Sequence, residues 1–367
     1  MSLKISIRGI GVWLGFAVLL FFSGFRWDVG VDFMAYYNLY GENWLANAFL
    51  LDRIEWGNIG LKYILFISGF DDGRYWIWAM AFITLFFVFY SISHYAKHVL
   101  FPMVLFICLG YFFYTLNGIR QYCAVSITMF AWQFLMKDKF LKYFIVIFCA
   151  SLFHKSALIM LPFYLIRKRV LQKNTWIVLF CICLPMAFVA SYVVPHIMSL
   201  FPSYSVYEDM SFSEASGNML SYARLIFPIT LFVLTMMVYD KLMEKENDRV
   251  IVNLALCAML WMIVFPNTPL MVRISYYFQF SFLFFIPLLC RTLAWKNGRL
   301  VALYVILFNL LFISIILFSR PAAKIVPFQL DFSIFGLGLC KISLVLWIVL
   351  LLFIRVLGVS GSKQLQV

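Results

Sequence analysis

The sequence predicts an all-α polytopic membrane protein, and three observations carry that prediction. Hydrophobic residues make up 65% of the 367 residues and charged residues only 12%, whereas soluble domains are about half apolar and about a quarter charged. The mean hydropathy is +0.95. The apolar residues lie in runs of about 20, which is the length a helix needs to cross a bilayer. We therefore expect a single transmembrane domain over residues 1–367, with about 12 membrane-spanning segments.

Long apolar runs separated by short polar loops are the candidate spanning helices. The first run follows Lys4 and Arg8 and lacks a small-residue cleavage site, so we expect a retained helix rather than a signal peptide. In chain order the runs cover residues 5–25, 76–93, 99–116, 121–136, 175–194, 222–239, 250–265, 274–290, 300–318 and 335–357. Two other stretches are ambiguous: residues 55–70, which Lys62 interrupts, and residues 143–166.

The basic loops discriminate between two arrangements of these ambiguous stretches. If residues 55–70 span and residues 143–166 form one helix, Lys137, Lys139 and Lys142 face outward, against the positive-inside rule. If residues 55–70 lie along the outer interface and residues 143–166 form a hairpin of two short helices, every basic loop faces inward. We favour the second arrangement, which puts the N and C termini in the cytoplasm. It leaves large outer loops at about residues 26–75, 195–221 and 319–334.

The predicted hairpin has His154 and Lys155 at its tip. Each arm has about a dozen residues and rises roughly 18 Å, which is short of the hydrocarbon core of roughly 30 Å. The tip would therefore form the floor of a cavity open to the outside, where irregular backbone is tolerated. Charged groups inside a membrane segment usually serve a function. The alternative is one long helix with His154 satisfied in the bundle core.

Three arginines point to an anion site on the same outer side. Arg120, Arg224 and Arg273 each open a helix that descends from the outer face, where free N–H groups and the helix dipole favour an anion. A guanidinium adds bidentate donors that match phosphate. We predict a pocket for a diphosphate, assisted by Lys155 and Arg320. The alternative is that each arginine merely reaches the lipid headgroups.

Two outer loops mix carboxylates with aromatic rings, at residues 26–44 and 202–218. Rings stack on the CH groups of sugars, and carboxylates bond to sugar hydroxyls. An aromatic interface belt explains the rings but not the carboxylates. The predicted sugar contacts are Arg26, Asp28, Tyr36, Glu208 and Asp209.

Several other classes of protein are disfavoured. No GxxxxGK[ST] or GxGxxG pattern predicts a nucleotide site, and no Cys/His spacing predicts a metal site. We expect neither cofactor nor metal. The net charge of +13 follows from inward-facing basic loops and does not call for a nucleic-acid partner. A transferase of this kind would take a donor activated by a lipid.

Four stretches match one known family in order and spacing over residues 26–280. They are "RWDVGVDFMAYY", "NGIRQYCAVSI", "ASLFHKSALIMLPFYL" and "VRISYYF". The combination of "IRQ" at residues 119–121 with "FHKSAL" at residues 153–158 is the most specific part. In these stretches the chain resembles the Wzy/EpsG-type polysaccharide polymerases of bacterial inner membranes.

The resemblance implies a membrane-embedded, metal-independent glycosyltransferase whose outer side is the periplasm. Such polymerases move a growing glycan from undecaprenyl diphosphate to the non-reducing end of an incoming undecaprenyl-diphosphate-linked repeat unit. The expected partners are these lipid-linked oligosaccharides and the bilayer. A flippase and a chain-length regulator of the same pathway are further candidates.

The implied reaction assigns two tasks to the candidate residues. Preorganised cations stabilise the departing diphosphate, and a general base takes the proton of the attacking hydroxyl. The first task falls to the predicted diphosphate ligands. For the base, Asp32 is favoured and His154 is second, although His154 could instead donate to the diphosphate. An O-antigen ligase, a flippase and a non-catalytic membrane protein remain alternatives; a flippase should show two repeated halves, and none is evident.

Overall fold

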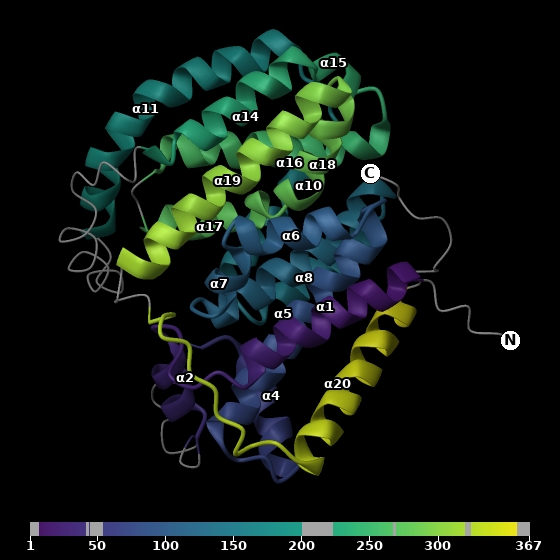
Figure 1. Ribbon diagram of the computed structural model, residues 1–367, viewed down its shortest axis with the longest axis vertical. Coiled ribbons are helices and arrows are strands. Elements are labelled where there is room, and N and C mark those ends of the chain that lie inside the picture. The colour runs from purple at the N-terminus through teal and green to yellow at the C-terminus, as the bar shows by residue number, and fades with distance from the viewer. Residues whose placement is uncertain are drawn as a thin grey trace, which may run out of the picture. The chain divides into compact units, whose positions relative to one another are not determined.

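In the computed structural model, the residues described are 7–41, 44, 54–199, 223–266, 269–319 and 324–357. Their regular structure is helical throughout (Figure 1), apart from an isolated antiparallel bridge between Arg26 and Leu330. The chain divides into two compact units. Unit 1 comprises residues 1–161 and 309–367, and unit 2 comprises residues 162–308. The single transmembrane domain expected from the sequence stays a prediction.

Unit 1 is built around one long apolar helix. Its helices in chain order are α1 (Ile7–Gly24), α2 (Phe33–Leu39), α4 (Trp56–Ile67), α5 (Gly73–Tyr95), α6 (Leu100–Cys108), α7 (Tyr111–Thr115), α8 (Ile119–Met136), α9 (Phe140–Ser151), the 3-10 helix η1 (Lys155–Met160) and α20 (Leu337–Val356). A helix that is hydrophobic all round must be buried, and α5 is 89% buried between α1, α8 and α20. Polar side chains of α8 in this core bond to their own helix, as Thr128 Oγ1 does to the Val125 carbonyl at 2.7 Å.

The segment before α20 lies against the loop that follows α1 (Figure 1). The N–H of Gly30 donates to the Lys324 carbonyl at 2.7 Å, and the N–H of Trp27 donates to the Gln329 carbonyl at 3.0 Å. Within its described residues, the predicted outer loop 319–334 therefore packs on the beginning of the predicted outer loop 26–75. The predicted loop 26–75 is partly helical, since it contains α2 and α4.

The stretch 143–166 reverses direction, as the hairpin interpretation requires. Helix α9 ends at Ser151, and η1 begins at Lys155 after a turn. The Tyr143 hydroxyl donates to the Met160 carbonyl, a contact that a straight helix could not make because its rise would separate these residues by about 25 Å. The reversal is confirmed, but the first part of the second arm is a 3-10 helix rather than an α-helix.

Unit 2 is organised around α16. Its helices are α10 (Phe163–Ile166), α11 (Lys173–Ser199), α14 (Ile226–Met237), α15 (Tyr239–Leu242), α16 (Glu246–Val264), α17 (Pro269–Gln279), α18 (Phe282–Thr292) and the first part of α19 (Trp295–Ser319). α11, α14 and α17 pack on α16. The Asn253 amide of α16 donates to the carbonyls of Ile166, Arg167 and Arg169 and so holds the turn after α10.

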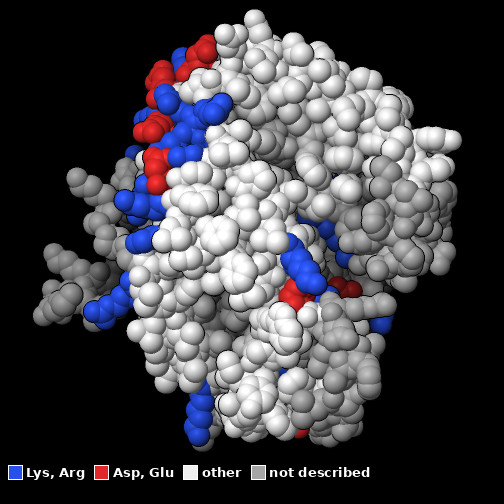
Figure 2. All heavy atoms as spheres, turned by 180° about the vertical axis from the view of Figure 1, so that it is seen from behind, with Lys and Arg blue, Asp and Glu red and all other residues white. Residues whose placement is uncertain are grey.

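Among the described residues, five helices are long and apolar enough to cross a membrane, or six if the bent pair α17–α18 counts as one span. Several predicted runs are broken: Gly110, with a φ of +79°, separates α6 from α7, and α17 meets α18 at 53°. Much of the surface is apolar, and on the face that Figure 2 shows the charged side chains gather in a few places. The fold is that of a multi-pass membrane protein. The number of 12 spans and the cytoplasmic termini stay predictions.

Candidate functional site

The predicted site residues fall into three groups. Unit 1 holds Arg26, Asp28, Asp32, Tyr36, Arg120, His154 and Lys155. Unit 2 holds Arg224 and Arg273. Glu208, Asp209 and Arg320 lie outside the described residues.

Arg120 lies in the first turn of α8 and is held on two sides. Its Nη1 is 2.6 Å from Oε2 of Glu55, and its Nε donates to the Tyr36 hydroxyl at 3.0 Å. The guanidinium carbon is also 5.7 Å from the centre of the Tyr36 ring. The Arg120 side chain keeps 23% of its surface exposed and Glu55 only 9%. The guanidinium is thus oriented by the protein and still reachable from solvent.

Glu55 connects this arginine to the turn at His154. Its second oxygen, Oε1, accepts the backbone N–H of Lys155 at 3.2 Å. Asn58 Nδ2 is 3.5 Å from Oε2 of Glu55 and donates to the Phe153 carbonyl at 2.9 Å. Glu55 was not among the site residues predicted from the sequence. The only local signal was an acidic residue just before a helix in an outer loop, a position that the helix dipole favours for any carboxylate.

The first turn of α4 lies directly against the turn between α9 and η1. The Gly57 N–H donates to the Leu152 carbonyl at 2.8 Å. A Cβ on Gly57 would lie 2.6 Å from the same carbonyl oxygen, so only glycine allows this approach. This docking brings Glu55 to Arg120 and to Lys155.

His154 precedes η1 in an extended conformation that orients its ring. Nδ1 accepts the backbone N–H of Ser156 at 3.4 Å and lies 2.6 Å from the Ser156 hydroxyl. Since Nδ1 accepts the N–H, the neutral imidazole carries its proton on Nε2, where it acts as a donor. Lys155 is exposed, and none of the described carboxylates forms an ion pair with it.

An aromatic layer supports Arg120 and Glu55. The Tyr40 ring stacks on Trp76 at a centroid distance of 4.0 Å, and Tyr36 lies 5.2 Å from Trp76. Burial raises the pKa of Tyr36 and of Tyr40, although the charge of Arg120 opposes the shift in both, so both phenols are protonated at neutral pH. Within the described part of the chain, the Tyr40 hydroxyl and the Asn58 side-chain oxygen Oδ1 are buried without a hydrogen-bond partner.

Asp32 precedes α2, one helical turn before Tyr36. Its carbonyl accepts the Tyr36 N–H at 3.1 Å, and its carboxylate is close enough to contribute to the raised pKa of Tyr36. The side chain is half-buried. The predicted base candidate therefore lies at the start of the helix that carries Tyr36, the tyrosine that contacts Arg120.

Arg26 and Asp28 have different surroundings. Arg26 is 3% exposed and donates to the carbonyls of Val29 and Leu116 and to Ser23. Burial lowers the pKa of Arg26 to about 9, so the side chain is charged at neutral pH. Asp28 has a φ of +47° and pairs with Lys324 at 3.5 Å. Arg26 thus binds the loop after α1, and its role in sugar binding stays a prediction.

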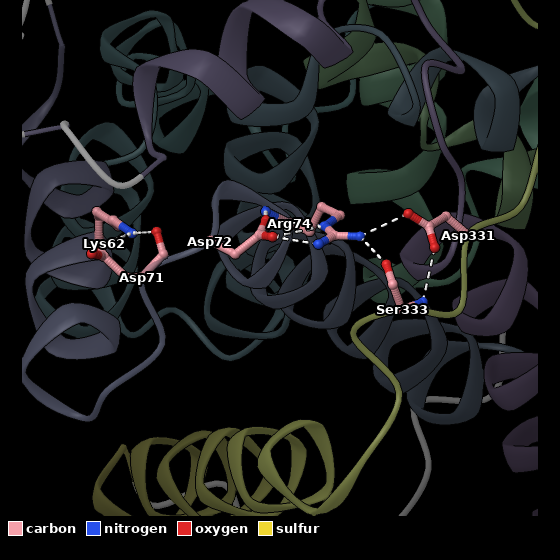
Figure 3. Close-up of polar contacts among 6 residues, drawn as sticks. All are labelled: Lys62, Asp71, Asp72, Arg74, Asp331 and Ser333. Atoms are coloured by element: carbon pink, nitrogen blue, oxygen red, sulfur yellow. Dashed lines mark hydrogen bonds and ion pairs between the residues drawn. The ribbon is translucent and has the colours of Figure 1, made fainter.

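Unit 1 contains a second network of charged side chains, near the start of α5 (Figure 3). Arg74 contacts Asp72, Asp331 and Ser333, and thereby joins the start of α5 to the segment before α20. Burial opposes ionisation of Asp72, but hydrogen bonds from Arg74 outweigh it and lower the pKa of Asp72. Lys62, which is fully buried, bonds to the carbonyl of Asp71 at 2.6 Å and to its carboxylate at 3.3 Å. Each charged side chain of this network is paired with another member of it, which is typical of a structural network.

In unit 2, Arg224 lines a small cavity of about 30 Å³ together with Ser275, Tyr276 and Gln279 of α17. Arg273 lies on the same helix and is exposed. The two arginines are therefore on neighbouring elements. Their predicted cooperation with Arg120 stays a prediction. Among the residues that the structure describes, no three His, Cys, Asp or Glu side chains are grouped so that they could hold a metal ion.

A family model described as the EpsG family matches residues 12–330. No curated protein and no solved structure gives a detectable match to the chain. The family match begins in α1, ends in the segment before α20 and includes every predicted site residue. Because it covers most of the sequence, the chain belongs to the EpsG family.

Proposed function

We propose that the protein is a polysaccharide polymerase of the bacterial inner membrane. It would transfer a growing glycan from undecaprenyl diphosphate to the non-reducing end of a repeat unit that is also linked to undecaprenyl diphosphate, on the periplasmic side. Membership of the EpsG family and the apolar helices indicate a membrane protein of polysaccharide biosynthesis with a polymerase-like, glycosyltransferase activity. The substrate, the side of the membrane and the residue roles are the proposal.

One observation carries this proposal: donors suited to a phosphate already converge on an anion in unit 1. The guanidinium of Arg120 and the backbone N–H of Lys155 both contact the Glu55 carboxylate. Planar guanidinium forks and backbone N–H groups are common ligands of phosphate oxygens. The exposed ammonium of Lys155 and the Nε2–H of His154 belong to the same turn and add two donors.

In the proposed reaction, the acceptor hydroxyl oxygen attacks the anomeric carbon of the donor. The bond from that carbon to the diphosphate oxygen breaks, and the diphosphate leaves with the electron pair. Arg120 and Lys155 would stabilise the growing negative charge, with Arg224, Arg273 and Arg320 as further ligands. The acceptor proton passes to Asp32, or to His154 if the histidine is the base. Because fixed cations supply the charge, we expect no requirement for a metal or a nucleotide.

The sugar would be held by the carboxylates and rings of the outer loops. Tyr36 presents a protonated hydroxyl beside Arg120, and Asp28, Glu208 and Asp209 are further candidates. A flippase that supplies the lipid-linked units and a chain-length regulator are the proposed protein partners.

The direct test is polymerisation by the purified protein in lipid nanodiscs. A synthetic undecaprenyl-diphosphate oligosaccharide should be converted into a ladder of longer glycans without added metal or nucleotide. If only single units are recovered, the polymerase proposal fails.

Deletion of the gene separates the two nearest alternatives. Loss of a polymerase leaves surface chains of one repeat unit. Loss of a flippase removes surface chains altogether, and loss of an O-antigen ligase leaves long polymer on its lipid carrier.

A further inference from the structure

We propose that Glu55 is an exchangeable counter-anion: in the resting protein its carboxylate occupies the place that the substrate diphosphate takes during the reaction. This inference rests on the proposed function and deepens it, because it states how the diphosphate site is kept when no substrate is bound. It also assigns a role to a residue that the proposed chemistry does not use.

The contacts of the carboxylate are those of a bound anion. Oε2 lies 2.6 Å from Nη1 of Arg120, while Oε1 accepts the Lys155 N–H at 3.2 Å. Two oxygens of one anionic group thus accept from a guanidinium nitrogen on one side and from a main-chain N–H on the other. A phosphate presents oxygens of the same charge and needs the same donors.

Two buried polar atoms near this ion pair lack a hydrogen-bond partner among the described residues. Asn58 is 0% exposed, and its side-chain amide oxygen Oδ1 has no hydrogen-bond partner among the described residues. The Tyr40 hydroxyl, also at 0% exposure, has none either, and Tyr40 lies close enough to Arg120 and Glu55 for both charges to affect its pKa. Buried polar atoms are normally bonded, and the Tyr40 hydroxyl is a donor that an anion can accept from, so it indicates that the resting arrangement is incomplete without a ligand.

Glu55 can be displaced without loss of local structure. It precedes α4, but its side chain does not cap the backbone N–H groups of that helix, and its contact with the Asn58 side chain in the first turn is long, at 3.5 Å. The helix is docked instead by the Gly57 N–H on the Leu152 carbonyl at 2.8 Å and by the Asn58 amide on the Phe153 carbonyl at 2.9 Å. A rotation of the Glu55 side chain would therefore free Arg120 and leave α4 in place.

A second arginine–carboxylate pair of unit 1, Arg74 with Asp72, lacks this property. Asp72 accepts the backbone N–H of Arg74 at 2.8 Å and so caps α5, while Arg74 also bonds to Asp331 at 2.7 Å (Figure 3). Removal of Asp72 from Arg74 would cost a helix cap as well as an ion pair. Asp72 is consequently a matched control for Glu55.

A built-in competitor has a use in a processive transferase. Every cycle leaves a lipid diphosphate in the site, and product release often limits turnover. Interactions that hold substrate and product equally do not accelerate the chemical step. By returning to Arg120, the tethered carboxylate weakens the binding of the diphosphate in substrate and product alike, and so helps the product to leave.

The test is the affinity of the purified protein in nanodiscs for farnesyl diphosphate, measured by calorimetry. Glu55→Gln keeps the size of the side chain and removes its charge. We expect its Kd to be about tenfold lower than that of the wild type, whereas Asp72→Asn, with the same change in net charge, should stay within about twofold. In the polymerisation assay, Glu55→Gln should lower KM without raising kcat.

If Glu55 has a purely structural role, Glu55→Gln should change the Kd in the opposite direction. If Glu55 only positions Arg120, Glu55→Gln loosens the arginine and the Kd rises; an unchanged or higher Kd, or no binding by the wild type, overturns the inference. If Glu55→Gln does not fold, Glu55→Asp serves, because its shorter carboxylate cannot reach both donors, and its Kd should also fall. Tighter binding in a protein that extends no chain would refute the polymerase while leaving the counter-anion role intact.

Discussion

Arg120 binds through the shape of its guanidinium as well as through its charge. Nε donates to the Tyr36 hydroxyl, and Nη1 contacts Glu55. The two bonds leave from different nitrogens of one planar group. A lysine ammonium is a single point charge on a flexible stem and cannot make both contacts in this geometry.

Replacement of Arg120 should therefore abolish polymerisation even when the charge is kept. We expect Arg120→Ala and Arg120→Lys each to lower the rate by about 10²-fold or more, the usual effect of losing one preorganised donor to a developing anion. Arg299→Lys is the control, since Arg299 is exposed and its guanidinium carbon lies 4.0 Å from the centre of the Trp295 ring. Wild-type rates in Arg120→Lys would identify Arg120 as an interface anchor instead of a ligand.

Asp32 and His154 compete for the role of general base, and substitutions separate them. If Asp32 takes the proton, Asp32→Asn should lower turnover by about 10²–10⁴-fold and leave diphosphate binding unchanged. If His154 donates from Nε2, His154→Gln, which keeps a donor, should retain more activity than His154→Ala. The rates come from the nanodisc polymerisation assay. Near-normal turnover in Asp32→Asn, with both histidine variants equally inactive, would make His154 the base.

At the scale of elements, the site depends on how α4 docks. Its first turn contacts the turn between α9 and η1 through the Gly57 N–H and the Asn58 side chain. The acid partner of Arg120, the amide of Lys155 and the ring of His154 come together only because these two elements touch. The hairpin therefore positions donors from a part of the chain that is remote from α4 in sequence.

A methyl group at Gly57 should separate these elements. The added Cβ would lie 2.6 Å from the Leu152 carbonyl oxygen, so Gly57→Ala should cost about 1–3 kcal/mol of stability and reduce polymerisation. Gly60→Ala, on the same helix, meets nothing within 4 Å and should be neutral or stabilising by up to about 1 kcal/mol. Thermal unfolding in detergent and the polymerisation assay check both variants. Equal behaviour of the two would show that the docking of α4 does not matter.

At the scale of the whole molecule, the orientation in the membrane decides which side the site faces. The positive-inside rule puts the hairpin tip outside and the basic segment after α10 inside. Cysteines in place of Ser156 and Gln172 should therefore react with an impermeant thiol reagent from opposite sides.

We expect Ser156→Cys to be labelled in intact cells and Gln172→Cys only after the membrane is opened. The protein with its eight native cysteines gives the background of the reagent. Labelling of Ser156→Cys only from the cytoplasm would reverse the topology, and the periplasmic site would then be wrong.

The sequence by itself determined the helical membrane class, because hydropathy follows from composition and a helix satisfies its own backbone in lipid. It also located the reversal near His154, because the excess of basic residues in the flanking loops bears on topology directly. Topology, loop composition and the family resemblance put Arg120, Asp32, Tyr36 and His154 on one outer side, and the structure puts them in one unit.

Only the tertiary structure decided which group meets Arg120. Glu55 is 65 residues away along the chain, and its distance to Arg120 depends on the docking of α4 against the turn before η1. No local pattern encodes such a contact. The burial of Arg26 was equally hidden, since its carbonyl partners come from a loop and from Leu116, which is 90 residues distant. Periodicity and composition report on one segment at a time, whereas an ion pair between segments exists only when packing brings both ends together.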